Sequence, residues 1–410
     1  MTTPAIGEST EALQQRSQQY KGFNPIQYAW FDNEDSKKWW DQTAPILTRV
    51  FEAAKYDVQQ QYLYMTLYRT FLIPFLGPHP GDWGSFITYS GIPVEFSINY
   101  QDNGPPTCRI GWEPVSHASG TAQDPFNNGT VAEAMTAIGQ LKLKGLETGL
   151  FDHFVQTLTV NSQDGAGVDV AQLPISRFRN QVAFGLDLKG GGVTIKCYIY
   201  PALKGFVTKK PFRELLDHAI QTSDDVMNCA NYLKGVSDYL EGAGLYNQYS
   251  FIGFDLVDGS KSRLKVYNTI QDVTWAKLEQ IWTLGGSFAH DTSIQRGLGF
   301  ARELWQLLTL HLDKMAVGIW NYELTPGGMV PNPKWYFILT GLNDLENAQA
   351  IIKFYQSLGW LELAESFIST FQSYFPDSDF STTDNLLQYV SLAYSEKTGV
   401  YFSVYYHSSR

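Results

Sequence analysis

The chain has 410 residues, of which 44% are hydrophobic, and it carries a formal net charge of −11 at pH 7. This length suits two or three ordinary domains or one large barrel, and the acidic balance argues against a nucleic-acid partner, because phosphate backbones are bound by basic surfaces. The N-terminus lacks the pattern of a signal peptide, no apolar stretch approaches membrane-spanning length, and the three cysteines form no paired framework. We therefore expect a cytoplasmic protein without a membrane partner.

The N-terminal part of the chain combines a polar segment, two helices and a group of strands. Residues 1–34 are predicted to be a polar lead-in, and residues 35–410 a single domain, because no Pro- or Ser-rich linker divides them. Tryptophan and aliphatic residues at helical spacing predict two helices over 35–72. Alternating segments then predict strands over 85–90, 94–101 and 107–114.

From residue 181 onward, strand pairs recur with a regular period. Hairpin signals mark 181–188 with 192–200, 249–257 with 262–269, 315–323 with 334–341, and 386–395 with 399–407. Helical stretches are predicted over 131–155, 211–241, 272–284, 294–313 and 344–374. The second strands begin at residues 192, 262, 334 and 399, which indicates one helix–helix–strand–strand unit repeated along the chain. With the N-terminal strands, five units give ten antiparallel strands, and closing such a sheet into a barrel removes its edges.

Cations and tyrosines alternate along the second strands. The segments are Lys196–Tyr200, Arg263–Tyr267, Lys334–Tyr336 and, in degenerate form, Tyr401–Tyr405. Side chains two residues apart share one face of a strand, so each segment has a polar face and an apolar face. A water-facing strand would explain any one segment. The repeated choice of residues favours a closed sheet with a polar, positive lumen, covered outside by helices, and such a lumen suits a small polyanion.

These features resemble the dimethylallyltryptophan synthase family of fungal aromatic and indole prenyltransferases. The resemblance rests on the repeat, on the run Trp83-Gly84-Ser85-Phe86-Ile87-Thr88 leading to Gly91-Ile92-Pro93-Val94-Glu95, and on the paired Lys-x-Tyr-x-Tyr and Arg-x-Lys-x-Tyr strands. It covers roughly residues 35–407. It implies an α/β fold of the ABBA type, an (ααββ)5 barrel with ten antiparallel strands around a solvent-filled lumen and an outer ring of helices. It also implies transfer of a dimethylallyl group from its diphosphate to an indole-containing acceptor in secondary metabolism.

The resemblance further implies roles for individual residues. Arg109, Lys196, Arg263 and Lys265 would hold the diphosphate, together with Lys334, where several members have Gln. The rings of Tyr198, Tyr267, Tyr336, Tyr401 and Tyr405 would shield the allylic cation, and their hydroxyls could reach the phosphates. Ile87 and Tyr200 would contact the acceptor, and Glu95 would lie next to the indole N–H. A further arginine that some members use in the last repeat is not identifiable in this sequence.

Glu95 lies on an alternating strand and shares its face with Pro93 and Ser97, opposite Val94 and Phe96. A carboxylate in the lumen can accept the indole N–H. The structural alternatives are an ion pair with Arg109 and a solvent-facing side chain.

A metal site is not expected. Asp224-Asp225 is not followed by the third carboxylate of a DDxxD magnesium motif and is predicted to be a helix face, and the histidines lack metal-ligand spacing. The resemblance implies dimethylallyl diphosphate as co-substrate, and we expect no cofactor and no metal.

Two alternatives remain open from the sequence. A phenolic or polyketide acceptor would keep the fold, and a non-catalytic barrel that binds an amphipathic anion would keep the positive lumen. Members that use free tryptophan tend to hold its carboxylate with an arginine before the third hairpin, whereas residues 246–250 contain no cation. This favours a tryptophan-containing cyclic dipeptide or another uncharged tryptophan derivative. The expected partners are two small-molecule substrates, with a homodimer as an open alternative.

Overall fold

The computed structural model describes residues 29–81, 83–161, 163–169, 180–223, 230–308 and 315–407. Ten antiparallel strands close into a barrel in which each strand pairs with its sequence neighbours and β1 pairs with β10. The strands are β1 (Val94–Gln101), β2 (Gly104–Trp112), β3 (Val182–Lys189), β4 (Gly192–Ile199), β5 (Phe251–Asp255), β6 (Leu264–Val273), β7 (Met315–Leu324), β8 (Asn332–Ile338), β9 (Leu387–Ser395) and β10 (Gly399–Tyr406). The predicted ABBA-type barrel is confirmed.

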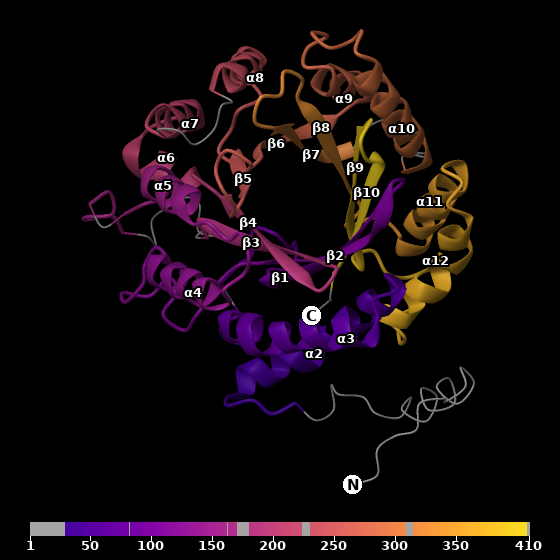
Figure 1. Cartoon of the computed structure of the whole chain (residues 1–410), viewed down its shortest axis with the longest axis horizontal. Coiled ribbons are helices and arrows are strands. Elements are labelled where there is room, and N and C mark those ends of the chain that lie inside the picture. Colours follow the sequence, from indigo (N-terminus) through magenta and orange to yellow (C-terminus); the bar gives the residue numbers. More distant parts are fainter. Residues whose placement is uncertain are drawn as a thin grey trace, which may run out of the picture.

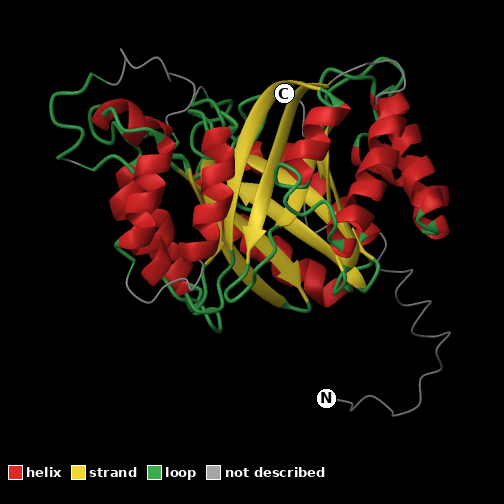
Figure 2. Cartoon of the chain, turned by 90° about the horizontal axis from the view of Figure 1, so that it is seen from above, coloured by secondary structure: helices red, strands yellow, loops and turns green. Residues whose placement is uncertain are grey.

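Helices form a ring outside the strands, as Figure 1 shows along the barrel and Figure 2 from the side. Each hairpin is preceded by two described helices, or by three in the case of β5–β6. The helices are α2 (Glu34–Ala53), α3 (Val58–Leu67), α4 (Asn128–Gln140), α5 (Gly149–Leu158), α6 (Ala202–Thr208), α7 (Phe212–Gln221), α8 (Ala230–Gly242), α9 (Trp275–Trp282), α10 (Thr292–Leu308), α11 (Asp344–Ser357) and α12 (Leu361–Tyr374). A short π-helix over Tyr68–Leu72 and a 3-10 helix over Ile73–Phe75 follow α3.

The strand predicted over 85–90 is wrong, because this segment is a loop. Its backbone donors are bonded to side chains: the Ser85 hydroxyl accepts the N–H groups of Ile87 and Thr88 at 3.0 and 3.1 Å. The flanking residues Gly84 and Gly91 have φ of 77° and 83°, a left-handed conformation that interrupts a strand. Alternation alone does not distinguish such a loop from a strand.

The long helical stretches are divided. The stretches predicted over 131–155, 211–241 and 344–374 each contain two helices, and Gly145 and Gly359 have φ of 78° and 76° at two of the breaks. The helix predicted from residue 272 begins only at Trp275, because β6 continues to Val273. Most of the predicted lead-in, the pair Asp224-Asp225 and the end of the helix predicted over 294–313 lie outside the described residues. The single-domain boundary at residue 35 stays a prediction.

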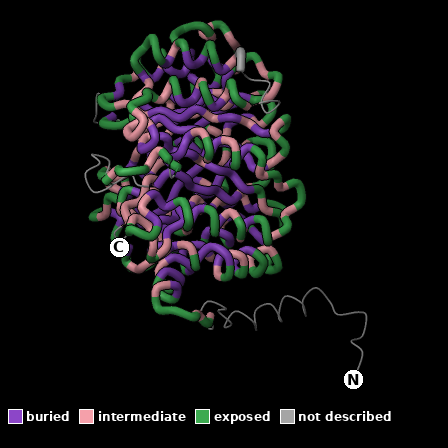
Figure 3. Tube along the Cα trace, turned by 90° about the vertical axis from the view of Figure 1, so that its left-hand side faces the viewer, coloured by how far each residue is buried: buried purple, intermediate pink, exposed green. Residues whose placement is uncertain are grey.

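The main hydrophobic core lies between the barrel and the helices. Val94, Phe96 and Ile98 turn outward from β1 into this core, and α2 covers them with a face that includes the fully buried Leu47. Burial of one such leucine contributes about 1.5–3 kcal/mol. Figure 3 shows buried strands beneath helices whose outer faces are exposed. None of the described helices combines the length and the apolar character that crossing a membrane would require.

Candidate active site

The barrel encloses a cavity of about 2080 Å³, which lies inside the ring of strands. Every residue that the sequence proposed for the site lines this cavity. These residues are Ile87, Glu95, Arg109, Lys196, Tyr198, Tyr200, Arg263, Lys265, Tyr267, Lys334, Tyr336, Tyr401 and Tyr405. The cavity brings them together, while the roles assigned to them stay predictions.

The lumen residues follow one order along the second strands. Lys196 and Tyr198 on β4 are followed by Tyr200, directly after the end of that strand, and Lys334 and Tyr336 follow each other on β8 in the same direction. Because all neighbouring strands are antiparallel, the second strands of the hairpins run in one direction. Successive lumen residues lie about 7 Å apart along a strand. The cavity therefore passes from a cationic end, through a tyrosine layer, to an opposite end, which we call the acceptor end.

Two of the cations share the carboxylate of Asp187 on β3. Arg109 lies directly opposite Asp187, with its Nε 2.9 Å from Oδ1, and Lys196 contacts the other carboxylate oxygen. Burial alone would raise the pKa of Asp187, but the positive charges of Arg109 and Lys196 hold it well below its usual range. The guanidinium of Arg109 also bonds the Tyr401 hydroxyl. These cations are therefore held in place without a ligand.

A second group lies between β5, β6 and β7. The guanidinium of Arg263 lies 2.8 Å from Asp255 and 3.2 Å from Glu323, and the Lys265 ammonium lies 3.3 Å from Glu323. Burial opposes ionisation of Glu323, but Lys265 and Arg263 lower its pKa to about 2. Glu323 is therefore ionised at neutral pH.

The register of the barrel shows why Lys334 differs from the other cations. Where one hairpin meets the next, the cation stands directly opposite an acid in three cases: Arg109 with Asp187, Lys196 with Asp255, and Lys265 with Glu323. At the seam between β8 and β9, Lys334 stands opposite Ala393. No described carboxylate forms an ion pair with its ammonium, which lies 4.8 Å from the centre of the Tyr401 ring. Burial and the charges of Arg109 and Lys265 hold the pKa of Lys334 well below its usual range.

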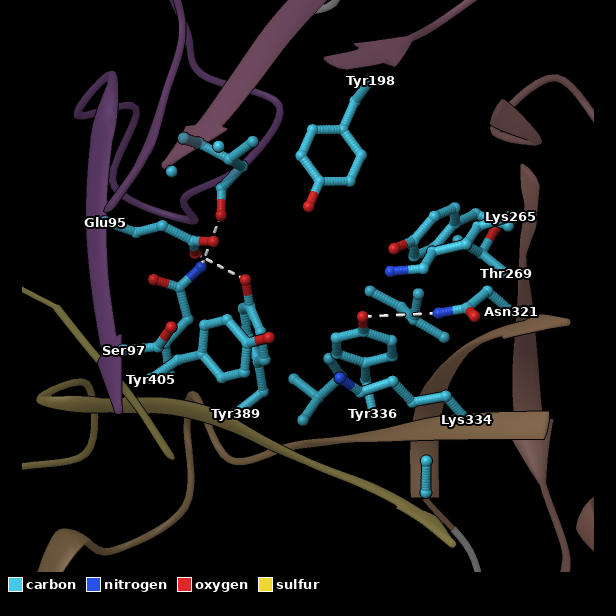
Figure 4. Close-up of a pocket in the computed structure, with 18 of the residues that line it drawn as sticks. Glu95, Ser97, Tyr198, Lys265, Thr269, Asn321, Lys334, Tyr336, Tyr389 and Tyr405 are labelled. Atoms are coloured by element: carbon cyan, nitrogen blue, oxygen red, sulfur yellow. Dashed lines mark hydrogen bonds between the residues drawn. The ribbon is translucent and has the colours of Figure 1, made fainter. Parts of the chain in front are cut away.

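Tyrosine rings form a continuous belt next to the cations (Figure 4). Tyr336 lies at its centre, with ring centroids 6.2 Å from both Tyr267 and Tyr405 and 5.8 Å from Tyr389. Tyr198 continues the belt at 6.0 Å from Tyr267. The faces of such rings attract a cation without offering a strong nucleophile.

Glu95 lies within the tyrosine layer. It stands directly opposite Gly111 on β2, and its Oε2 accepts a hydrogen bond from the Tyr389 hydroxyl at 2.5 Å. The alternative of an ion pair with Arg109 does not hold among the described contacts, since Arg109 is paired with Asp187. Burial raises the pKa of Glu95 to about 8, the hydrogen bond from Tyr389 opposes this rise, and the Glu113 carboxyl adds to it. Glu95 is thus a carboxyl poised to exchange a proton near neutral pH.

Aromatic side chains build a wall at the acceptor end. The Phe86 ring lies 4.1 Å from Tyr200, which lies 4.8 Å from Phe251. Ile87 continues this wall, and its carbonyl accepts a hydrogen bond from the Gln388 amide at 2.7 Å. A flat apolar ring can therefore pack here beside Glu95.

Sequence reasoning missed several residues of this site, because it considered mainly the second strands. Asp187, Asp255, Glu323 and Tyr389 all lie on first strands, on the faces that line or border the cavity. Asp187 stands between Leu186 and Leu188 on β3, so strand alternation could have placed it on the lumen face, opposite these leucines. Its pairing with Arg109 depends on register between repeats, which alternation does not reveal.

The described residues hold no group of three or more histidines, cysteines or acids placed to bind a metal ion. In this lumen, positive charge comes from the side chains of the cationic end.

Cations that can hold a leaving diphosphate, next to ring faces that can stabilise a carbocation, define a prenyl-transferring barrel. The chain belongs to the tryptophan dimethylallyltransferase family, whose sequence model matches residues 35–370. Prenyltransferase phqJ of Penicillium fellutanum is 45% identical over 344 residues, covering 84% of this chain and 85% of the relative. Deoxybrevianamide E synthase notF of Aspergillus sp. (strain MF297-2) is 36% identical over 408 residues, covering 93% and 89%.

Solved structures agree with this assignment. A crystal structure of NotF in complex with brevianamide F and DMSPP has 37% sequence identity and a TM-score of 0.87, covering 94% of this chain and 97% of that one. A crystal structure of AnaPT from Neosartorya fischeri has 29% identity and a TM-score of 0.83, covering 92% and 94%. The chain is thus an indole prenyltransferase, and the non-catalytic barrel is set aside.

Proposed function

We propose that this enzyme transfers a dimethylallyl group from dimethylallyl diphosphate to an uncharged indole-containing acceptor, without a metal ion. The diphosphate would bind at the cationic end and the indole at the acceptor end, with the tyrosine layer between them. The relative NotF has been crystallised with brevianamide F and DMSPP together, which supports a lumen that holds both substrates at once.

The observation that carries this proposal is the charge of the cationic end. Arg109, Lys196, Arg263, Lys265 and Lys334 face only three carboxylates among the described residues. Those carboxylates belong to Asp187, Asp255 and Glu323, so the basic side chains outnumber the acids by two. A diphosphate can use this excess directly. Preorganised cations of this kind stabilise negative charge as it develops on a leaving group.

The chemical step begins when the allylic C–O bond breaks and its electron pair goes to the diphosphate oxygen. Tyr198, Tyr267 and Tyr336 surround the resulting allylic cation and keep water from it. The indole ring supplies an electron pair, a new C–C bond forms, and the ring becomes aromatic again when it loses a proton. Glu95, as a carboxylate, accepts the indole N–H or this proton.

Charges at the acceptor end favour an uncharged indole. The described lysines and arginines of the cavity lie at its cationic end, whereas Asp272 and Asp384 line it near the acceptor ends of β6 and β9. A free tryptophan would place its carboxylate among these groups with no cation to pair it, and an unpaired buried charge is costly. A cyclic dipeptide or another neutral tryptophan derivative avoids this cost.

Product analysis tests this function. The enzyme is incubated with dimethylallyl diphosphate and a panel of indoles, tryptophan-containing cyclic dipeptides and phenols, and products are identified by mass spectrometry. We expect prenylated neutral indoles, with a higher kcat/KM for the best of them than for free L-tryptophan. Exclusive turnover of phenols would refute the acceptor class, and preference for free tryptophan would refute the charge argument.

The role of Glu95 is tested by Glu95→Gln, which keeps the shape of the side chain and removes its charge. Help from a general base is typically worth about 10²–10⁴-fold, so kcat should fall by that order while the donor KM is retained. Glu133→Gln, at an exposed position on α4, is the matched control. A near wild-type kcat for Glu95→Gln would mean that another group takes the proton. Formation of a homodimer stays a prediction.

A further inference from the structure

A second carboxyl lies close to Glu95, and the chemical step does not use it. Glu113 follows β2 directly and shares the lumen side of that strand with Arg109 and Gly111. It is fully buried, behind the loop from Trp83 to Gly91 that lines the cavity. A buried carboxyl without a partner is costly, so its bonds should show what it does.

The bonds of Glu113 lead to this loop. Its Oε1 accepts the backbone N–H of Phe86 at 2.9 Å. Burial raises the pKa of Glu113 to about 7, and the neighbouring Ser85 hydroxyl and the Phe86 N–H limit the rise. Ser85 in turn accepts two further N–H groups of the loop. Glu113 and Ser85 therefore hold three backbone N–H groups of a loop that has no strand partner.

The shape of this loop decides where the acceptor wall stands. Phe86, whose N–H is held by Glu113, packs its ring on Tyr200 at 4.1 Å and on Phe251 at 5.8 Å. The next residue, Ile87, is bonded through its carbonyl to Gln388. Gln388 directly precedes Tyr389, which holds Glu95. The loop thus joins the acceptor wall to the layer in which the proton is transferred.

We propose that Glu113 is a positioning residue, which holds the loop Ser85–Thr88 against Tyr200 and thereby sets where the indole lies relative to Glu95. This inference rests on the proposed function, because the wall matters only if an aromatic acceptor binds against it. Glu113 acts through Phe86 and Ile87 and touches no reacting atom. Its loss should therefore affect the acceptor and the position of prenylation, and leave the donor unaffected.

The test compares Glu113→Ala with Glu113→Gln, which keeps an oxygen that accepts the Phe86 N–H. For Glu113→Ala we expect the acceptor KM to rise about ten-fold, the donor KM to stay within about two-fold, and the ratio of prenylated regioisomers to change. Glu113→Gln should remain close to the wild type in all three. The exposed Glu133→Gln serves as a control for charge alone.

Hydrogen exchange of residues 83–91, measured by mass spectrometry, tests the contact between Glu113 and the loop without any turnover. The loop should lose protection in Glu113→Ala and keep it in Glu113→Gln. If Glu113→Ala does not fold, Ser85→Ala removes the other holding side chain and should show the same split between acceptor and donor. An unchanged acceptor KM and regioisomer ratio, or equal losses for donor and acceptor, would overturn the inference. Failure of the wild type to prenylate any indole would refute the proposed function, and hydrogen exchange would still decide whether Glu113 holds the loop.

Discussion

Replacing Ala393 with aspartate would supply the acid that the seam between β8 and β9 lacks. Ala393 lies directly opposite Lys334 and lines the cavity. The new carboxylate would stand toward Lys334 as Asp187 stands toward Arg109 across the first seam. The open lumen leaves room for the added atoms, so the variant should fold. The Lys334 ammonium would then have an internal partner before the donor arrives.

The expected loss follows from one contact. In the wild type, burial and neighbouring cations hold the pKa of Lys334 below its usual range. Only the protonated amine holds a phosphate well, so donor affinity should fall as pH rises through that lowered pKa. In Ala393→Asp the new carboxylate raises the pKa of Lys334 and also forms an ion pair with its ammonium group. A charge-assisted contact contributes about 1.5–3 kcal/mol, so the donor KM should rise about ten- to a hundred-fold. The pH above which donor affinity falls should be higher than in the wild type.

Steady-state kinetics with dimethylallyl diphosphate and calorimetric titration with inorganic pyrophosphate measure this loss. Ala393→Asn is the matched control, because it adds nearly the same shape without the charge, and its donor KM should change little. The acceptor KM should stay near the wild-type value in both variants. Equal donor KM values for the Asp and Asn variants would refute the reasoning that an unpaired Lys334 serves the donor.

Three further predictions follow from the same site. Activity in excess EDTA should remain a substantial fraction of that with Mg²⁺, because the side-chain cations can neutralise the diphosphate, and complete loss restored by Mg²⁺ would contradict this. Lys196→Ala and Arg263→Ala should each weaken donor use about ten- to a hundred-fold with little change in acceptor Kd, as kinetics and titration can show. Because the pKa of Glu95 is about 8, kcat/KM for the acceptor should rise with pH toward that value. Tyr389→Phe removes the hydrogen bond that opposes the raised pKa of Glu95, so the rise of kcat/KM should occur at higher pH. An unchanged pH profile would show that Tyr389 does not lower the pKa of Glu95.

The sequence predicted the barrel because its information is local and repeated. Alternation along β4 places Lys196 and Tyr198 on one face, and a hairpin turn sets the partner strand. These relations extend over a few residues and recur in each repeat. Closure of the barrel follows from their number, since a sheet of ten strands covered on one face avoids open edges by closing.

Long-range relations could not be predicted in this way. Tyr389 reaches Glu95 only because closure of the barrel brings β10 beside β1 and β9 next to it. The loop at residues 85–90 alternates like a strand, yet its Phe86 N–H is bonded by Glu113, which follows a different strand. The acids of the cationic end pair across repeats, and a shift of one residue in register would turn each of them to the outer face. The roles of the lumen residues stay predictions until substrates and variants are measured.

The incomplete pairing of the cationic end reconciles two opposing demands. Cations buried without partners would destabilise the empty barrel. If every cation were paired with an acid, no positive charge would remain free to bind the diphosphate of the donor. Asp187, Asp255 and Glu323 meet the first demand at three seams, and the alanine opposite Lys334 meets the second at the fourth. A barrel built from repeats can make this compromise at one seam without changing the others. A diphosphate that enters the lumen then completes a pattern of opposite charges that the register of the strands has already set.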